Sequence, residues 1–285
     1  MQEYVSVIIP TWNRAEFLEK AVDSVLNQTW PHFELIVVDD GSDDSTRDLV
    51  AGYGSKVAYV RQENLGPAAA RNTGVGRARY DLIAFLDSDD LFEPDKLEVQ
   101  VAAMRSQPDF LISHTQEIWF KRGCILNQKK KHRKDGGDIF FRSLALCVVG
   151  MSTVMVRRQL FEMIGFFDEE LPCCEDYDFW LRVSVSHPFL LIDQPLTRKN
   201  GGRPDQVSFR YRVGMDRFRI RAIERLLAAE VLSFEQRKSA IQELVRKGTI
   251  YGIGCLKHER NDEGRNFLAL ALKYQKELDL MENSL

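Results

Sequence analysis

The sequence predicts an α/β fold in which a mostly parallel, Rossmann-like sheet is flanked by helices and followed by a C-terminal helical extension. Strand-like and helix-like segments alternate from residue 4 to residue 90. The strand-like segments are apolar throughout instead of alternating, which is typical of strands covered on both faces. From about residue 211 the pattern changes to successive amphipathic helices. These three observations predict the architecture.

The elements of the first half follow from local sequence signals. The segment YVSVII is β-branched and ends at Pro10, and apolar residues then recur at helical spacing. Proline is tolerated in the first turn of a helix, so Gly66-Pro67 predicts a helix start. In chain order we expect a strand over 4–9, a helix over 15–28, a strand over 33–38, a helix from Asp44 or Ser45 to about Gly52, a strand over 57–61, a helix from Gly66 and a strand over 81–86.

The second half is expected to be less regular. Residues 110–120 predict two short strands or the arm of a hairpin, and FLLID at 189–193 predicts a further strand. The segment EDYDFWLRV predicts a helix that begins at Glu175. Three helices should follow Tyr211, with Ser233 and Asn261 as caps. We therefore expect a domain at 1–210 and a helical extension at 211–285, which docks on that domain or on a second copy of the chain.

Polar clusters follow three of the predicted strands, at 10–13, 39–42 and 87–90. The carboxyl ends of parallel strands lie along one edge of a sheet, where ligands bind, so the clusters should converge on one site. Any one of them alone could be a solvated turn. Asp87 and Asp89 have the spacing to direct two carboxylates at Mg²⁺ or Mn²⁺. Asp90 is expected to turn outwards and brace the next helix.

Composition and missing motifs exclude several classes of protein. The net charge of −3 gives no general attraction to nucleic acid. No G-x-G-x-x-G follows the first strand and no G-x-x-x-x-G-K-[ST] occurs, which argues against dinucleotide enzymes and ATPases. We expect no signal peptide and no membrane span. The five cysteines lack zinc-like spacing and suit reduced thiols in the cytoplasm. The sequence instead favours a ligand with a diphosphate group, held by a metal at Asp87 and Asp89 and assisted by Arg71.

Four motifs, in this order, closely resemble glycosyltransferase family 2, the inverting enzymes of GT-A fold. They are VSVIIPTWNRAEFLEKAVDSVLNQTWPHFELIVVDDGSDDST, NLGPAAARNTGV, FLDSDDLFEPDKL and GFFDEELPCCEDYDFWLRV, and the resemblance spans about residues 4–200. It implies a metal-dependent transferase that uses a nucleoside-diphosphate sugar, usually a UDP-sugar. It implies a donor site formed by Pro10, Thr11, Asn13, Asp39, Asp40, Arg71, Asp87, Ser88, Asp89, Glu175, Lys199 and Asn200.

The resemblance also implies individual roles. Asp39 would accept a hydrogen bond from the base, Asp40 would support its loop, and Asp89 would bind the metal directly. Asp176 matches the catalytic base, and inverting transfer does need a carboxylate to take the proton of the acceptor hydroxyl. The metal would stabilise the departing diphosphate. Glu175 and Asp176 could instead serve only to stabilise the start of their helix.

One segment departs from the family pattern. In LTRKNGGRPDQVS, at 196–208, many relatives carry a histidine two positions after the arginine, where this chain has Asn200. Asn200 is a weaker ligand, so Lys199 or Arg203 would meet the phosphates instead. The glycines and length of this segment suit either a lid over the donor or a plain surface loop.

A basic run occupies 129–134, between the D-x-D motif and Asp176. The first interpretation is a solvated loop, and the second is a guide for an anionic acceptor or a contact with the inner face of the membrane. The acceptor is expected to be a glycan, a lipid-linked molecule or a small molecule, with synthesis of a polysaccharide or cell-envelope glycan as the setting.

The most specific prediction is therefore a cytoplasmic, inverting, metal-dependent glycosyltransferase. Two alternatives belong to other classes. One is a catalytically silent GT-A module that binds nucleotide sugar or glycan, although it would have no need to keep Asp87, Asp89 and Asp176. The other is a sugar nucleotidyltransferase, which typically has a glycine- and arginine-rich loop where this chain has PTWNRAEF.

Overall fold

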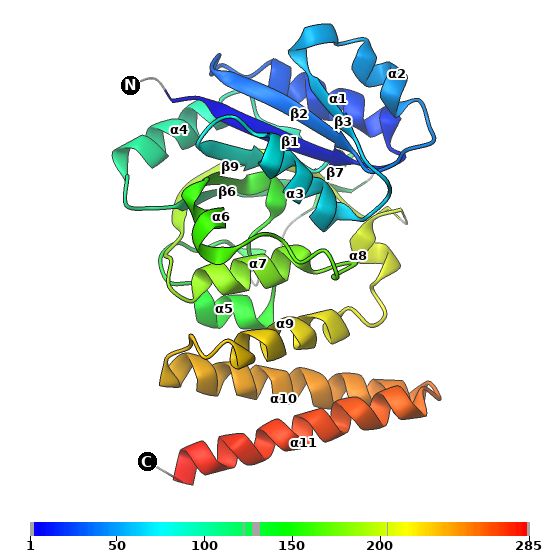
Figure 1. Cartoon of the computed structure of the whole chain (residues 1–285), viewed down its shortest axis with the longest axis vertical. Helices are drawn as coiled ribbons and strands as arrows, with labels where there is room; N and C mark the ends of the chain where they lie inside the picture. The colour runs from blue at the N-terminus through cyan, green and yellow to red at the C-terminus, as the bar shows by residue number, and fades with distance from the viewer. Residues whose placement is uncertain (1–2, 122, 127–131, 204, 284–285) are drawn as a thin grey trace.

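The computed structural model describes residues 3–121, 123–126, 132–203 and 205–283. Figure 1 shows the sheet and its covering helices in the upper part of the molecule. Three C-terminal helices lie below the sheet, and α11 is the farthest from it. They are α9 (Asp216–Ala228), α10 (Phe234–Lys257) and α11 (Asn261–Asn283).

The sheet has a parallel half and a mixed half. Its order, with β7 (Cys124–Leu126) paired to β6, is β3 (Ala58–Arg61), β2 (Phe33–Asp39), β1 (Val5–Thr11), β4 (Leu82–Phe85), β8 (Val154–Arg157), β6 (Ile112–Lys121), β9 (Leu190–Asn200) and β5 (Leu91–Phe92). The first four strands run parallel, as β6 and β9 also do, whereas β5, β7 and β8 pair antiparallel. In register, Thr11 lies beside Asp39, so β1 and β2 end together. The predicted mostly parallel α/β sheet is confirmed.

Helices cover both faces because successive strand residues point to opposite sides. Ile8, Ile36 and Ile83 pack on the face of α3 and α7, while Val7 and Leu35 pack on the face of α1 and α4. The helices before residue 211 are α1 (Ala15–Leu26), α2 (Thr46–Ala51), α3 (Pro67–Arg77), α4 (Lys96–Ser106), α5 (Phe140–Ala145), α6 (Gln159–Ile164), α7 (Glu175–Ser184) and α8 (Val207–Arg210), with 3-10 turns at Gly54–Lys56 and Met151–Thr153.

One glycine allows α3 to lie directly on the central strand. A Cβ added at Gly74 would come within 2.4 Å of Ile8 Cγ2. Any larger residue at this position would push the helix away from the sheet. This close packing fixes the position of α3, and with it the position of Arg71.

The C-terminal helices share a hydrophobic cluster with α5 and α7. Ile223 and Leu244 are fully buried there, beside Tyr177 and Phe140. The predicted cap at Ser233 is confirmed, since its side chain accepts from Gln236 in a capping box. Asn261, expected as a cap, is instead the first residue of α11. No helix in the described ranges is long and apolar enough to cross a membrane.

Two sequence-based expectations for the mixed half need correction. Strand β9 does not end near Asp193 but continues to Asn200, because β5 and β6 supply hydrogen-bonding partners along it. The first part of the expected lid is therefore a strand. In the basic run, residues 129–131 lie outside the described ranges, and Lys134 is not solvated. It is 2% exposed and lies 3.2 Å from Glu117 of β6.

Candidate functional site

The structure brings the three strand-end clusters together at the carboxyl edge of the parallel strands. The Asp40 amide donates to the carbonyl of Thr11 at 2.9 Å, which joins the ends of β1 and β2. The Asn13 amide donates to Ser42 Oγ at 2.9 Å. Arg14, one residue after the first cluster, lies 3.3 Å from Asp89 of the third. Segments far apart in sequence thus form one connected, largely buried network of polar groups.

Asp39 lies at the buried end of this network. It is 0% exposed, and its carboxylate accepts from the Ser42 amide at 2.8 Å and from Tyr59 Oη at 2.5 Å. Burial and the hydrogen bond to Asp39 raise the pKa of Tyr59 to about 12. Arg61 Nε is 3.9 Å from the same carboxylate. The fold therefore holds the carboxyl group of Asp39 in a fixed orientation.

Asp40 supports the loop before α3. Its carboxylate accepts from the backbone amides of Leu65 at 2.9 Å and Gly66 at 2.8 Å. Gly66 has a φ of 95°, a conformation that costs glycine little. The short turn that these bonds hold leads directly into α3.

The remaining residues of the first and third clusters have different environments. Pro10 is buried within β1 beside Val38, and Ser88 is 4% exposed. Asn13 is exposed, with a φ of 51°, and its Oδ1 accepts from the Asp43 amide at 2.8 Å. Thr11 Oγ1 is buried and has no hydrogen-bond partner in the described part of the chain. Buried hydroxyl groups are normally hydrogen-bonded, so this one marks Thr11 as a residue with an unused hydrogen-bonding group at this edge.

Arg71 joins the D-x-D motif to the helix that carries Asp176. It is 5% exposed, and its guanidinium lies 2.8 Å from Asp87 Oδ1 and 2.5 Å from Glu175 Oε1. Burial opposes ionisation of Asp87, but Arg71 and then Lys199 keep the pKa of Asp87 below its ordinary value. For Glu175 burial prevails over the attraction of Arg71, so its pKa is raised.

Asp89 is also met by arginine side chains. Its Oδ2 lies 2.5 Å from Arg203 and accepts from Gln206 at 3.1 Å, in addition to the contact with Arg14. Arg203 stacks on Phe17 of α1 at 4.1 Å. The second part of the expected lid, after β9, therefore lies against the D-x-D motif.

Lys199 and Asn200 lie at the end of β9 beside the same motif. The Asn200 side chain donates to the Asp89 carbonyl at 3.0 Å, and its amide donates to Asp90 at 3.2 Å. Lys199 lies 3.8 Å from Asp90. Burial opposes the charge of Lys199, but Asp90 and Glu117 raise its pKa above the ordinary value.

The expectation that Asp90 turns outwards is wrong. Asp90 is 2% exposed and accepts from Ser152 Oγ at 2.7 Å. Its own amide donates to the Asp87 carbonyl at 2.9 Å, so the chain turns tightly and directs this side chain inwards. Burial, partly offset by Lys199, raises the pKa of Asp90 to about 8. Helix α4 begins only at Lys96.

Asp176 lies in the first turn of α7, where negative charge is favoured, and is partly exposed. Its Oδ1 accepts from the Tyr177 amide at 2.7 Å, and the thiol of Cys147 donates to its Oδ2 at 3.5 Å. Burial and the neighbouring Asp176 raise the pKa of Cys147 well above its ordinary value. Cys147 is therefore a neutral thiol that can orient the carboxylate.

Sequence reasoning missed several residues of this site. Arg14, Tyr59, Cys147 and Gln206 all contact a predicted site residue. Arg14 had a signal, since it follows directly on the first cluster. The others had none, because their partners lie 20 to 117 positions away in the chain.

The donor set at the D-x-D motif is compatible with one hard divalent ion. Among the described residues, no three His, Cys, Asp or Glu side chains gather into a site that would hold a metal by themselves. Asp87 and Asp89 supply two carboxylates, and Mg²⁺ commonly takes one or two carboxylates with water and substrate phosphates. The residues present therefore fit a metal that is completed by a diphosphate ligand.

Comparison with protein families identifies relatives of this chain. The family model described as glycosyl transferase family 2 matches residues 6–164. An uncharacterized glycosyltransferase of Rickettsia felis is 36% identical over 202 residues, which cover 68% of this chain and 32% of that protein. The putative teichuronic acid biosynthesis glycosyltransferase TuaG of Bacillus subtilis is 47% identical over 160 residues, which cover 54% of this chain and 62% of TuaG. The chain thus spans less than two thirds of the length of these relatives.

Solved structures share the fold at low sequence identity. S. aureus TarS 1–349 in complex with UDP-GlcNAc has a TM-score of 0.63 and 19% identity, covering 96% of this chain and 92% of that chain. The mannosyltransferase PcManGT of Pyrobaculum calidifontis, in complex with GDP-Man and Mn²⁺, has a TM-score of 0.58 and 18% identity, covering 99% and 85%. At this level of identity the likeness concerns the fold alone.

Proposed function

This chain belongs to glycosyltransferase family 2, and from that membership we propose that it transfers a sugar, with inversion, from a nucleoside-diphosphate sugar to an acceptor hydroxyl. The donor residues would lie in the domain at 1–210, and the helices at 211–285 would form an extension docked on it. The observation that carries the proposal is the double ion pair of Arg71 with Asp87 and Glu175. This pair fixes the start of α7, and therefore Asp176, beside the D-x-D motif.

In this proposal Asp176 is the general base. Its partial exposure lets an acceptor hydroxyl reach it, and the bonds from Tyr177 and Cys147 orient its carboxylate. As the hydroxyl attacks the anomeric carbon, the carboxylate takes its proton. Glu175 is paired with Arg71 and does not compete for this role.

Asp87 and Asp89 would hold Mn²⁺ or Mg²⁺ together with the donor diphosphate. A bound divalent ion supplies electrostatic stabilisation of the leaving diphosphate. Arg203 and Gln206 now contact Asp89, and their segment would rearrange around the metal. Lys199 and Asn200 at the end of β9 lie close enough to the motif to face the phosphates. PcManGT, of similar fold, was solved with GDP-Man and Mn²⁺.

For the nucleotide we propose a UDP-sugar, with Pro10, Thr11, Asn13 and Asp39 around the base and ribose. TarS 1–349, which shares the fold, was solved with UDP-GlcNAc. The unused hydroxyl group of Thr11 and the fixed carboxyl group of Asp39 suit a hydrogen-bonding ligand. For the acceptor we propose a cell-envelope glycan or its lipid-linked precursor, because TuaG is named for teichuronic acid biosynthesis.

Two further contacts belong to the proposal. Membrane contact through 129–134 can no longer involve Lys134, because that side chain is buried against Glu117. Any such contact would rest on the other residues of the run. Pairing of two copies would use the outer face of the C-terminal helices, where Ile250 and Leu272 are 56% and 58% exposed.

A donor screen by thermal shift, with and without Mn²⁺, tests the proposal. A nucleotide sugar present at 100 times its Kd should stabilise the protein by about 2.7 kcal/mol. The variant Asp176→Asn should keep this stabilisation and lose at least a hundredfold in transfer. If no nucleotide sugar stabilises the protein in the presence of metal, the proposed function is wrong. Near-normal transfer by Asp176→Asn would refute the choice of base.

A further inference from the structure

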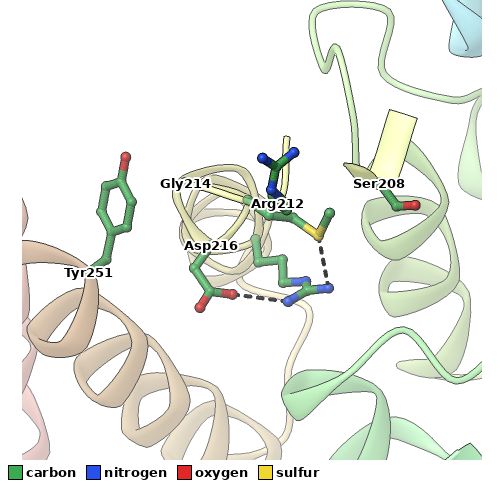
Figure 2. Close-up of a pocket in the computed structure, with 7 residues that line it drawn as sticks. Ser208, Arg212, Gly214, Asp216 and Tyr251 are labelled. Atoms are coloured by element: carbon green, nitrogen blue, oxygen red, sulfur yellow. Dashed lines mark hydrogen bonds and ion pairs between the residues drawn. The ribbon is translucent and has the colours of Figure 1, made fainter. Parts of the chain in front are cut away.

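A pocket of about 340 Å³ lies between the segment that follows β9 and helix α10. Figure 2 shows Tyr251 of α10 and Ser208 at opposite sides of the pocket, with Arg212 and Asp216 between them. A water molecule takes about 30 Å³ of liquid volume, so this pocket can hold an anionic group together with part of a sugar. None of the donor-site residues named above lines it.

The lining of the pocket is positively charged. Arg212 and Arg219 are its cations and Asp216 its only acid. Asp216 is already shared, since it lies 3.1 Å from Arg219 and 3.4 Å from Lys247. Arg212 stacks on Phe209 at 3.9 Å and donates to that residue's carbonyl, with no carboxylate partner among the described residues. Arg212 is exposed, so its charge is solvated and is not engaged by a protein carboxylate.

One buried donor group in the pocket lacks a partner, and one exposed hydroxyl group is open to a ligand. The Nε of Arg219 is buried and has no acceptor in the described part of the chain. Ser208 is exposed, and its hydroxyl group makes no hydrogen bond to the described part of the chain. Arg219 Nη1 and Nη2 already meet Asp216 and Met215. A buried donor without an acceptor is unfavourable, so a shift of the Arg219 side chain towards an oxyanion would gain the missing hydrogen bond. Guanidinium groups suit phosphate and carboxylate because they donate two parallel hydrogen bonds.

Arg219 connects the pocket to the start of α7, because its charge acts on Cys147, whose thiol donates to Asp176. Arg219 packs over the ring of Tyr177 at 5.8 Å, and Tyr177 directly follows Asp176. On the other side, Ser208 is two residues after Gln206, which donates to Asp89. One wall of the pocket thus belongs to a residue that contacts the helix of Asp176, and another follows the segment that covers Asp89.

We propose that this pocket binds an oxyanion of the acceptor, a phosphate or a carboxylate, through Arg212 and Arg219, and so presents the acceptor hydroxyl to Asp176. The acceptor is then an anionic glycan or glycosyl phosphate and not a neutral sugar. This inference rests on the proposed function, because it assigns the pocket to the acceptor of that reaction.

The first test measures binding without turnover. Inorganic phosphate is titrated by thermal shift into the wild type, Arg212→Gln and the control Arg105→Gln, which removes an exposed arginine of α4. UDP and Mn²⁺ are present in excess to fill the donor site. Acetate and chloride are titrated separately, at matched ionic strength, as anions for comparison with phosphate. We expect the phosphate concentration that gives half of the maximal shift in Tm to be at least tenfold higher for Arg212→Gln than for the other two proteins. Equal titrations for Arg212→Gln and the wild type would overturn the proposal.

The different ligands in this test distinguish a failure of the proposed function from a failure of the pocket proposal. Stabilisation by UDP and Mn²⁺ alone reports on the proposed function, and its absence would refute that function without affecting the comparison of phosphate titrations. Saturation by acetate at lower concentration than phosphate would assign the pocket to a carboxylate, and the reverse order to a phosphate. Chloride as effective as both would show that the pocket selects no oxyanion, which contradicts the proposal.

The second test uses paired acceptors, an alkyl glycoside and its phosphate ester. Arg212→Gln should raise the KM for the phosphate ester about tenfold and leave the KM for the neutral glycoside unchanged. Arg212→Lys, which keeps the charge, should recover part of the loss. Hydrolysis of the donor by water should be equal in all variants. A wild type that uses the neutral glycoside at the lower KM would overturn the proposal.

Discussion

Removing the guanidinium of Arg71 should destabilise the protein strongly. Arg71 is 5% exposed and is the ion-pair partner of Asp87 and Glu175. Replacing it by methionine leaves a buried Glu175 carboxylate without its counter-charge. The loss of one member of a buried ion pair costs about 3–5 kcal/mol. At roughly 2–4 °C per kcal/mol for a protein of this size class, the Tm should fall by about 6–20 °C.

The loss of stability in Arg71→Met should increase with pH. Burial already raises the pKa of Glu175, and this group favours the folded state most when it is protonated. Without Arg71 its pKa rises further, so the variant loses stability as the pH rises through that value. The difference in Tm between the wild type and Arg71→Met should therefore be larger at pH 8 than at pH 5.

Thermal unfolding followed by circular dichroism at both pH values provides the measurement. The matched control is Arg77→Met, the same substitution at an exposed position of the same helix. We expect the control to change stability by no more than about 0.5 kcal/mol. The reasoning is refuted if Arg71→Met unfolds within 2 °C of the control, or if the difference from the wild type is independent of pH.

Three further predictions concern the metal, a buried histidine and the C-terminal helices. Asp89→Asn should weaken Mn²⁺-dependent binding of UDP-sugar at least tenfold by calorimetry, because it removes one of two carboxylates, and EDTA should do the same to the wild type. Burial lowers the pKa of His114 to about 3. The free energy of unfolding, measured with urea, should therefore fall between pH 6.5 and pH 3 by up to about 1.4 kcal/mol per pH unit. In His114→Gln this fall should be smaller. Ile223→Ala, at a fully buried position of α9, should cost about 2–5 kcal/mol in the same assay.

Each of these predictions has an outcome that contradicts it. If binding of UDP-sugar depends on Mn²⁺ in Asp89→Asn as it does in the wild type, Asp89 does not bind the metal. A parallel pH dependence of the wild type and His114→Gln would mean that another group titrates in this range. A cost below 1 kcal/mol for Ile223→Ala would show that α9 is not held by the shared cluster with α5 and α7.

The sheet and the position of the site were predictable because they follow from local patterns. Apolar strands that alternate with helices require a mostly parallel sheet, and parallel strands end at one edge. The strand ends at Thr11, Asp39 and Asp87 could therefore be placed at one site before any contact was known. The start of α7 at Glu175 and the cap at Ser233 were also predictable, since caps depend on residues within one turn.

The partners of the charged residues were not predictable in the same way. Asp90 was expected to face outwards, yet it is buried against Ser152, 62 positions away. Lys134 belongs to a basic run, which favours solvation, yet Glu117 of β6 pairs with it inside the protein. Strand β9 extends into the expected lid only because β5 and β6 lie beside it. In each case the deciding neighbour comes from a distant part of the chain.

The sequence by itself determined the strands and helices of the parallel half, the C-terminal helices and where the acidic motifs leave the sheet, because apolar periodicity and strand ends are local properties. Only the tertiary structure decided that Arg71 pairs with Glu175, 104 positions away, and that Arg203 covers Asp89 across 114 positions. Burial makes an unpaired charge costly, so a counter-charge must come from whichever segment the fold brings near. That requirement is satisfied in three dimensions and leaves no periodic signal in the chain.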